Sequence, residues 1–154
     1  MRRVLRLRRA EEEDEARLLI WRNTRSVREA SFSQREISAE EHHRWFVRKL
    51  ADSGCALLII EDEERPVGQI RLDRLDPDLA EVSIALATGA RGRGIGREAL
   101  RLAVPEASRL LDVANVKALV KRDNCASLRA FRAAGFRVIG EDDGAVELRR
   151  AAGG

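Results

Sequence analysis

The sequence of 154 residues has no tyrosine, two cysteines and three prolines, and its basic residues include only three lysines. The two cysteines, Cys55 and Cys125, cannot form a disulfide framework, and their separation does not match the spacing of metal ligands. We therefore expect two small thiols that are buried or partly buried, and no bound metal. The longest apolar run, Cys55–Ile60, is far shorter than the roughly 20 residues that a membrane-spanning helix needs, so no membrane partner is expected.

Charge along the chain is balanced rather than concentrated. The 29 basic and 26 acidic residues give a net charge of +3, and the arginines are scattered instead of forming one stripe, which does not favour nucleic acid as a partner. No linker, repeat or low-complexity tract is evident, which predicts a single domain over residues 1–154. The basic start MRRVLRLRR runs into AEEEDEAR without an apolar stretch, so we expect a cytoplasmic protein.

Hydrophobic periodicity and turn signals predict an alternation of strands and helices. A strand at residues 4–8 and a helix at 11–23 precede a polar stretch, 24–37, that has no clear period. Ser38 and Glu41 stand three residues apart, as in a capping box, and mark the start of a second helix. Three strands follow at residues 55–62, 64–75 and 78–88, and the turn signals between them predict an antiparallel meander.

The second half continues with a helix beginning near Arg97, in which Pro105 must produce a kink or start a new turn. A strand at 116–121 and a helix ended by Gly135 come next, and two strands surround the turn Asp143–Gly144. The predicted order is βααβββαβαββ. It places the fold in the α/β (α+β) class, with a mixed, mostly antiparallel central sheet flanked by helices.

Residues 87–100, ATGARGRGIGREAL, place four glycines and three arginines between a predicted strand and a predicted helix. The spacing G-x-G-x-G does not fit the dinucleotide fingerprint, and the missing Gly-Lys-Ser/Thr excludes a Walker loop. A plain turn between strand and helix is one interpretation, although one glycine would suffice for it. We favour a phosphate site, in which backbone N–H groups at the helix start bind the anion and Arg91 and Arg93 add positive charge.

Two motifs together resemble the GNAT superfamily of N-acetyltransferases. R-G-R-G-I-G resembles its [Arg/Gln]-x-x-Gly-x-[Gly/Ala] signature, and the preceding AEVSIALAT resembles its fourth strand. Further along, NCASLRAFRAAGF resembles the Asn-x-x-Ser…Gly-Phe segment of that family. The resemblance covers nearly the whole chain and implies the GNAT fold.

The resemblance implies acetyl-CoA as co-substrate and assigns its contacts. The pyrophosphate would bind the loop formed by Arg91, Gly92, Arg93, Gly94, Ile95 and Gly96. The pantetheine arm would lie beside Ile84 and Leu86, with Asn124, Ser127 and Phe131 near the pantetheine and the thioester sulfur. The alternative for Asn124, or for its neighbour Asp123, is an N-cap of the helix that follows.

The same resemblance implies two catalytic residues. Glu81 stands where many members carry a carboxylate that deprotonates the acceptor amine; its alternative is a strand-end carboxylate facing solvent. Members often have a tyrosine seven residues after the asparagine, and here that position is Phe131. Because phenylalanine has no proton to donate, protonation of the leaving thiolate would have to come from Ser127 or water, or would be absent.

The first third, with WRN at 21–23 and I-S-x-x-E-H-x-x-W-F at 37–46, resembles amino-sugar N-acetyltransferases of pseudaminic-acid and related nonulosonate pathways. Those enzymes acetylate the 4-amino group of a UDP-linked deoxy amino sugar. The resemblance makes candidates for acceptor binding of Arg22, Asn23, Arg28, His42 and Trp45. The alternative is that the aromatic residues Trp21, Trp45 and Phe46, at helical spacing, belong to the core.

The expected function is thus N-acetylation of a small-molecule amine, a nucleotide sugar in the leading interpretation, by a monomer or homodimer. Within the same fold, a protein N-terminal or ribosomal-protein acetyltransferase is the first alternative, and it would need an acidic peptide groove. A domain that binds acyl-CoA as a sensor without catalysis is the second, and Phe131 is the residue that favours it.

Overall fold

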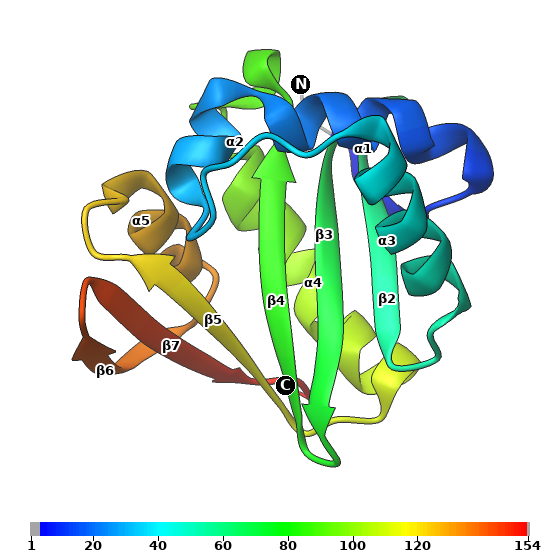
Figure 1. Cartoon of the computed structure of the whole chain (residues 1–154). Coiled ribbons are helices and arrows are strands. Elements are labelled where there is room, and N and C mark those ends of the chain that lie inside the picture. Colours follow the sequence, from blue (N-terminus) through cyan, green and yellow to red (C-terminus); the bar gives the residue numbers. More distant parts are fainter. Residues whose placement is uncertain (1–3, 154) are drawn as a thin grey trace.

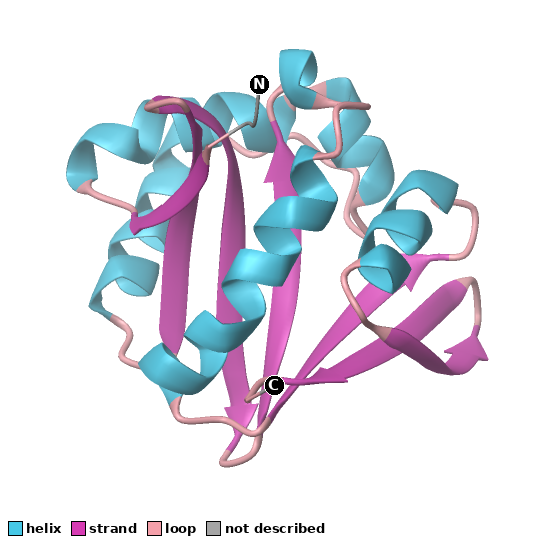
Figure 2. Cartoon of the chain, turned by 180° about the vertical axis from the view of Figure 1, so that it is seen from behind, coloured by secondary structure: helices cyan, strands magenta, loops and turns pink. Residues whose placement is uncertain are grey.

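The computed structural model describes residues 4–153, which form one seven-stranded sheet with helices on both faces (Figures 1 and 2). The strands are β1 (Leu5–Arg9), β2 (Cys55–Asp62), β3 (Arg65–Asp76), β4 (Leu79–Leu86), β5 (Asn115–Lys121), β6 (Arg137–Asp142) and β7 (Ala145–Ala151). The helices are α1 (Glu15–Asn23), α2 (Arg25–Ala30), α3 (Ala39–Ala51), α4 (Ile95–Leu111) and α5 (Cys125–Ala133), and two short 3₁₀ turns are η1 (Glu12–Asp14) and η2 (Thr88–Ala90).

The sheet order is β1-β2-β3-β4-β5-β7-β6, and every neighbouring pair is antiparallel except β4 and β5. The expected fold class, a mixed and mostly antiparallel sheet flanked by helices, is therefore confirmed. The predicted meander of β2, β3 and β4 is confirmed as well. None of the helices within residues 4–153 has the length and apolarity needed to cross a lipid bilayer.

The two central parallel strands separate soon after they meet. β4 pairs with β5 only from Leu79 to Glu81, opposite Asn115 to Lys117. Beyond that point β5 diverges and continues with β7, which leaves a wedge-shaped opening in the sheet (Figure 1). The backbone of β4 after Glu81 keeps its hydrogen bonds to β3 on one side and faces this opening on the other.

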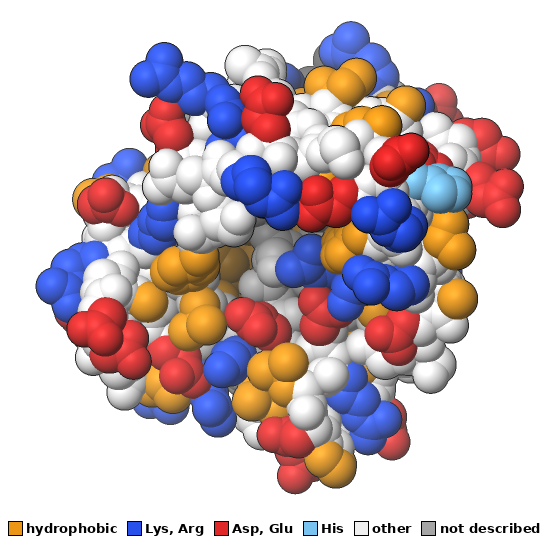
Figure 3. Space-filling model, in the orientation of Figure 1, with side chains coloured by type: hydrophobic (Ala, Val, Ile, Leu, Met, Phe, Trp, Pro, Cys, Tyr) orange, Lys and Arg blue, Asp and Glu red, His pale blue; other side chains and the backbone are white. Residues whose placement is uncertain are grey.

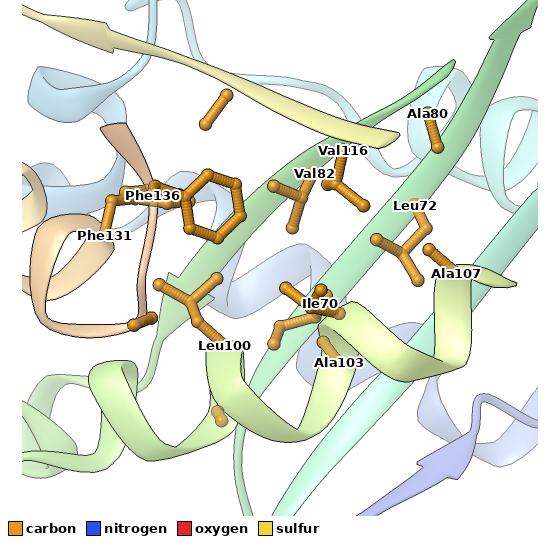
Figure 4. Packing of buried hydrophobic residues seen from close by; sticks show 14 of the residues in the cluster. Ile70, Leu72, Ala80, Val82, Leu100, Ala103, Ala107, Val116, Phe131 and Phe136 are labelled. Carbon is orange, nitrogen blue, oxygen red and sulfur yellow. The ribbon is translucent and has the colours of Figure 1, made fainter. Parts of the chain in front are cut away.

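Alternation along the strands divides the buried residues between two faces. One face packs against α4, where Leu100, Ala103 and Ala107 lie over Ile70 and Leu72 (Figure 4). A smaller cluster on the other face joins α1 and α3 to β2 and contains Leu18, Trp21, Phe46, Leu57 and Ile59. Burying one large apolar side chain of this kind stabilises the fold by about 1.5–3 kcal/mol. The two clusters hold the helices against the two faces of the sheet.

Helix α2 lies in the stretch for which the sequence showed no period. It has six residues, and Val27 is its one buried side chain. So short a segment has too few turns for a hydrophobic stripe, and its helicity depends on packing rather than on propensity. Lys121 of β5 donates to the carbonyl of Glu29 at 2.9 Å and ties this helix across the opening.

Several local predictions are tested by the chain's caps. Ser38 Oγ accepts the N–H of Glu41 at 3.1 Å, while the Glu41 carboxylate pairs with Arg35 instead of completing the capping box. Gly135 follows α5 with φ +95°, as expected of a helix-terminating glycine. Helix α4 continues through Pro105 to Leu111, so the prediction of a new turn there is wrong; Pro105 is exposed, and water can satisfy the carbonyl that it leaves unpaired.

The two thiols differ in their surroundings. Cys55 is buried, and its burial together with the neighbouring Asp73 raises the pKa of the thiol to about 12, so it stays protonated. Cys125 is exposed, which contradicts the expectation of a buried or partly buried thiol. It is the first residue of α5, a position at the surface end of the helix rather than on its packed face.

Gly68 of β3 is required by a close approach of β4. A Cβ atom there would lie 2.7 Å from the carbonyl oxygen of Ala85 and 3.2 Å from the Cα of Leu86. We expect Gly68→Ala to lower the free energy of unfolding by about 1–3 kcal/mol, since backbone must move to relieve the contact. Urea titration measures this, with Gly140→Ala, which meets no atom within 4 Å, as the control. Equal midpoints for the two variants would contradict the prediction.

Candidate functional site

A cavity of about 860 Å³ occupies the opening between β4 and β5. It extends from the glycine loop, past the free edge of β4, to residues of α1 and α2. Figure 3 shows the molecule hollowed near the centre of this face, with basic and acidic side chains around the hollow. Most of the residues expected to form a site line it: Arg22, Glu81, Ile84, Leu86, Arg91, Gly92, Gly94, Ile95, Gly96, Asn124, Ser127 and Phe131.

The glycine loop forms one end of the cavity. Gly92 and Gly94 have φ of +75°, a conformation that strongly favours glycine, and Gly94 is the N-cap of α4. A Cβ on Gly92 would meet no atom within 4 Å, so the backbone conformation, not a lack of space, calls for glycine there. The first N–H groups of this 17-residue helix have no partners within it, and together with the helix dipole they favour an anion.

Arg93 is placed away from the cavity, although the sequence predicted it as an anion contact. Its guanidinium lies 3.3 Å from Asp62 at the end of β2 and 3.5 Å from the carbonyl of Gly89. Arg91 lines the cavity, as do Arg97 from α4 and Arg129 from α5, which the sequence did not single out. Arg91 and Arg97 therefore add positive charge at the glycine loop, Arg129 adds it on the wall formed by α5, and Arg93 contacts the loop carbonyl of Gly89.

The wall beside the loop is apolar and ends in an open strand edge. Ile84 and Leu86 contact the helix side of the sheet, and their terminal carbons lie 3.9 and 3.7 Å from a Cβ built on Gly96. Because β5 has already diverged, the N–H and C=O groups of β4 on this edge are available to an extended ligand. An amide-containing chain can pair with such an edge in the way an added strand does.

Helix α5 forms the opposite wall. Asn124 Oδ1 accepts the N–H of Ser127 at 3.2 Å, so the expected N-cap is present, and both residues also line the cavity. Phe131 is 3% exposed, and its ring meets that of Phe136 edge to face at 5.0 Å. At the position of the expected proton donor the cavity thus has an apolar ring anchored in the core.

Glu81 lies at the point where β4 and β5 separate. It stands opposite Asp73 on β3 and Lys117 on β5, is half-buried, and forms no hydrogen bond or ion pair with any residue of the described part of the chain. Among the described residues that line the cavity it is the one carboxylate, against five arginines. A carboxylate with no other partner can accept a hydrogen bond from an incoming ammonium group, which makes Glu81 the candidate to receive its proton.

Two further arginines line the cavity on the face of the sheet that α1 covers, opposite α4. Arg22 comes from α1, and Arg71 comes from β3. Burial lowers the pKa of the Arg22 guanidinium, and the nearby positive charges of Arg35 and Arg71 lower it further. The sequence motifs do not point to Arg71. The available signal was alternation: the core residues Ile70 and Leu72 flank it, so Arg71 had to face the opposite side of a central strand.

Of the five candidates for acceptor binding, the structure brings Arg22 into the cavity wall. The amide of Asn23 both donates to and accepts from the backbone of Ile37, each at 2.8 Å, and anchors the segment after α2. Arg28 lies 3.9 Å from Glu36, outside the cavity lining. His42 and Trp45, both on α3, also lie outside that lining.

The aromatic residues of α1 and α3 fit the core interpretation in part. His42 is 3% exposed against Trp45 and Phe46, and burial lowers its pKa. Trp21 and Phe46 are buried in the small cluster, as the alternative predicted. Trp45 is half-buried, and the Arg71 guanidinium lies 5.5 Å from its ring centroid. Within residues 4–153, no group of three or more His, Cys, Asp or Glu is placed to hold a metal ion.

Comparison with known proteins bears on this geometry. Residues 4–137 match the family profile described as acetyltransferase (GNAT) domain. Among solved structures, a spermidine N-acetyltransferase from Vibrio cholerae in complex with CoA and spermine superposes with a TM-score of 0.86. It is 19% identical, over 96% of this chain and 95% of that one.

Two further solved structures are similar. A ribosomal-protein-alanine N-acetyltransferase from Brucella melitensis has a TM-score of 0.77 and 27% identity, over 94% of this chain and 98% of that chain. The N-acetyltransferase PseH from Campylobacter jejuni has a TM-score of 0.73 and 17% identity, over 96% and 97% of the two chains. The three structures share the fold, and the names of the first two indicate different acceptors, a polyamine and a ribosomal protein.

Proposed function

Since the chain belongs to the GNAT acetyltransferase family, we propose that it transfers acetyl from acetyl-CoA to the 4-amino group of a nucleotide-linked deoxy amino sugar, by direct attack in a ternary complex. That the protein is an N-acetyltransferase of the GNAT type follows from family membership. The acceptor and the residue roles are the proposal. The observation that carries the acceptor is the pair of arginines Arg22 and Arg71, which line the cavity apart from the glycine loop.

The glycine loop and the free edge of β4 offer the groups that would bind acetyl-CoA. The backbone N–H groups of Gly92–Gly96 would hold the pyrophosphate of CoA, aided by the charge of Arg91. The amides of the pantetheine arm would pair with the free edge of β4 near Ile84 and Leu86. This arrangement directs the thioester toward Glu81 and α5.

The proposed reaction begins with proton loss. Glu81 takes a proton from the acceptor ammonium, directly or through water, and the neutral amine attacks the thioester carbonyl. The tetrahedral intermediate loses a second proton from its nitrogen to water, collapses to the amide and expels the CoA thiolate, whose conjugate thiol has a pKa of about 8.5. Because Phe131 offers no proton, Ser127 or water protonates the thiolate, and Asn124 positions Ser127 through the cap of α5.

The charge of the cavity discriminates among acceptor classes. A polycation such as spermine would place several positive charges beside Arg22 and Arg71, and close like charges repel. The diphosphate of a nucleotide sugar has the opposite charge and suits arginine. The peptide alternative would want an acidic groove. The acidic run at residues 11–15 is engaged elsewhere, since Asp14 pairs with Arg8 and Glu15 pairs with His43.

A panel of amines tests this proposal. We expect release of free thiol from acetyl-CoA with UDP-4-amino-4-deoxy sugars, and little release with spermidine or with peptides carrying a free N-terminus. The same panel without protein gives the background rate. Turnover of peptides in preference to sugars would support the ribosomal-protein alternative and refute this acceptor. Binding of acetyl-CoA with no turnover of any amine would support the sensor alternative.

A further inference from the structure

We propose that Arg22 and Arg71 form a binding site for the anionic part of the acceptor, with the chemistry of a nucleoside diphosphate. The inference rests on the proposed function, because it names the residues that would recognise the acceptor. The site is separate from the arginines of the glycine loop, since it lies on α1 and β3, on the face of the sheet opposite α4.

Arg22 carries the first observation. Its Nη1 atom is buried and has no hydrogen-bond partner, while its Nη2 donates to the carbonyl of Ser33 at 3.2 Å. It forms no ion pair with any residue in the range 4–153, and Arg28 and Arg35 add to the positive charge around it. A buried guanidinium N–H without a partner is costly, which favours an anion close to this side chain.

Arg71 supplies a second guanidinium, held rigidly from behind. Its Nε donates to Asp73 Oδ2 at 2.7 Å, and its Nη2 lies 3.4 Å from Ser83 Oγ. Lys49 donates to the other oxygen of Asp73 at 2.8 Å, and the ring of Trp45 lies beside the guanidinium. Asp73 binds one edge of the Arg71 guanidinium and fixes the orientation of its plane. The remaining N–H groups therefore keep one direction.

The arrangement of charges defines what would fit. Glu81 stands opposite Asp73 and Arg71 stands opposite Ser83, so the carboxylate lies two residues along the strand from Arg71, where it can meet an ammonium group. The arginine pair can meet phosphate oxygens, and two guanidinium groups can share a diphosphate through charge-assisted hydrogen bonds. An acceptor with an amine at one end and a diphosphate at the other satisfies both. A neutral or polycationic amine leaves Nη1 of Arg22 unpaired.

Binding of uridine diphosphate to the CoA-saturated full chain tests the site without requiring catalysis. Because CoA then occupies the glycine loop, the heat released on adding UDP, UMP or uridine measures binding elsewhere in the cavity, where Arg22 and Arg71 lie. We expect UDP to bind more tightly than UMP, and uridine to bind weakly. Arg22→Gln and Arg71→Gln should each weaken UDP binding by about 10- to 100-fold and leave CoA binding unchanged.

Two matched variants complete the experiment. Arg25→Gln removes an exposed arginine just beyond α1 and should leave UDP binding unchanged. Arg22→Lys keeps the charge and loses the planar donor pair, so we expect a partial loss. Thermal unfolding of each variant identifies those that fold. Should Arg22→Gln fail to fold, Arg22→Lys and Arg71→Gln decide the outcome.

Several outcomes would overturn the inference: UDP that does not bind the CoA-saturated protein, UDP that binds no better than uridine, or UDP that binds both arginine variants as tightly as wild type. Arginine-dependent UDP binding without turnover of any UDP-linked amine would retain the site and refute the proposed acceptor. Turnover of a UDP amino sugar with unchanged KM in both variants would retain the proposed function and refute the site.

Discussion

Glu81→Gln is expected to lower kcat by about 100- to 10,000-fold, the range typical of a lost general base. Glutamine keeps the size of the side chain and cannot accept the ammonium proton. The position is half-buried and has no hydrogen-bond partner among the described residues, so the substitution leaves no structural contact broken. We therefore expect the KM for acetyl-CoA and the free energy of unfolding to remain near the wild-type values.

Rate measurements over a range of pH identify the cause of the loss. Without the carboxylate, the amine must lose its proton to water, so the rate of the variant should rise with pH until the amine itself is neutral. Glu81→Asp, which withdraws the carboxylate by one methylene, should retain part of the activity. Glu40→Gln, on the exposed side of α3, is the control. A Glu81→Gln enzyme with wild-type kcat and an unchanged pH profile would exclude Glu81 as the base.

Asp14→Ala is expected to lower the free energy of unfolding by about 3–5 kcal/mol, the usual cost of removing one partner from a buried ion pair. Asp14 is 1% exposed. Its carboxylate accepts hydrogen bonds from Nη1 and Nη2 of Arg8 at 2.8 and 2.9 Å and from the N–H of Glu11 at 2.8 Å. It also forms an ion pair with Arg17. Total stabilities of about 5–15 kcal/mol are usual, so the loss would be a large fraction.

The same residue predicts a pH dependence. Burial opposes ionisation of Asp14, but the hydrogen bonds from Arg8 and from the Glu11 N–H prevail, and the pKa of the carboxyl lies below its ordinary value. A lowered native pKa stabilises the fold above the unfolded pKa, near 3.9, and this contribution is lost as the pH falls through the native pKa. Glu61 accepts hydrogen bonds from Arg8 and Arg6, which lower the pKa of its carboxyl group. It therefore also stabilises the fold above its unfolded pKa and loses this contribution in acid.

Urea titrations at neutral pH and between about pH 4 and pH 2 measure both effects. Asp14→Asn should flatten the acid dependence, because it cannot titrate. Glu13→Ala, an exposed neighbour in η1, should behave as wild type. Since Asp14 holds β1 against the start of α1, partial loss of this contact should also loosen α1, which carries Arg22. An Asp14→Ala protein as stable as Glu13→Ala would contradict this account.

Local patterns in the sequence predicted most of the fold correctly. The strands β2 to β5, the cap of α5 by Asn124 and the helix-terminating Gly135 depend on residues adjacent along the chain. The same holds for the glycine loop, whose positive φ values at Gly92 and Gly94 reflect a local demand of the backbone. Helix α2 was not predicted, because its helicity depends on contacts with residues distant in the sequence, such as that of Lys121 with Glu29.

The composition of the cavity depended on tertiary structure. Short motifs were enough to predict the family resemblance, the glycine loop and the carboxylate at Glu81. They could not show that Arg93 turns back toward Asp62, or that Asn23 is engaged by Ile37. The proximity of Arg22 and Arg71 in the cavity wall depends on tertiary structure, because they lie on a helix and a strand that sheet pairing and core packing bring together.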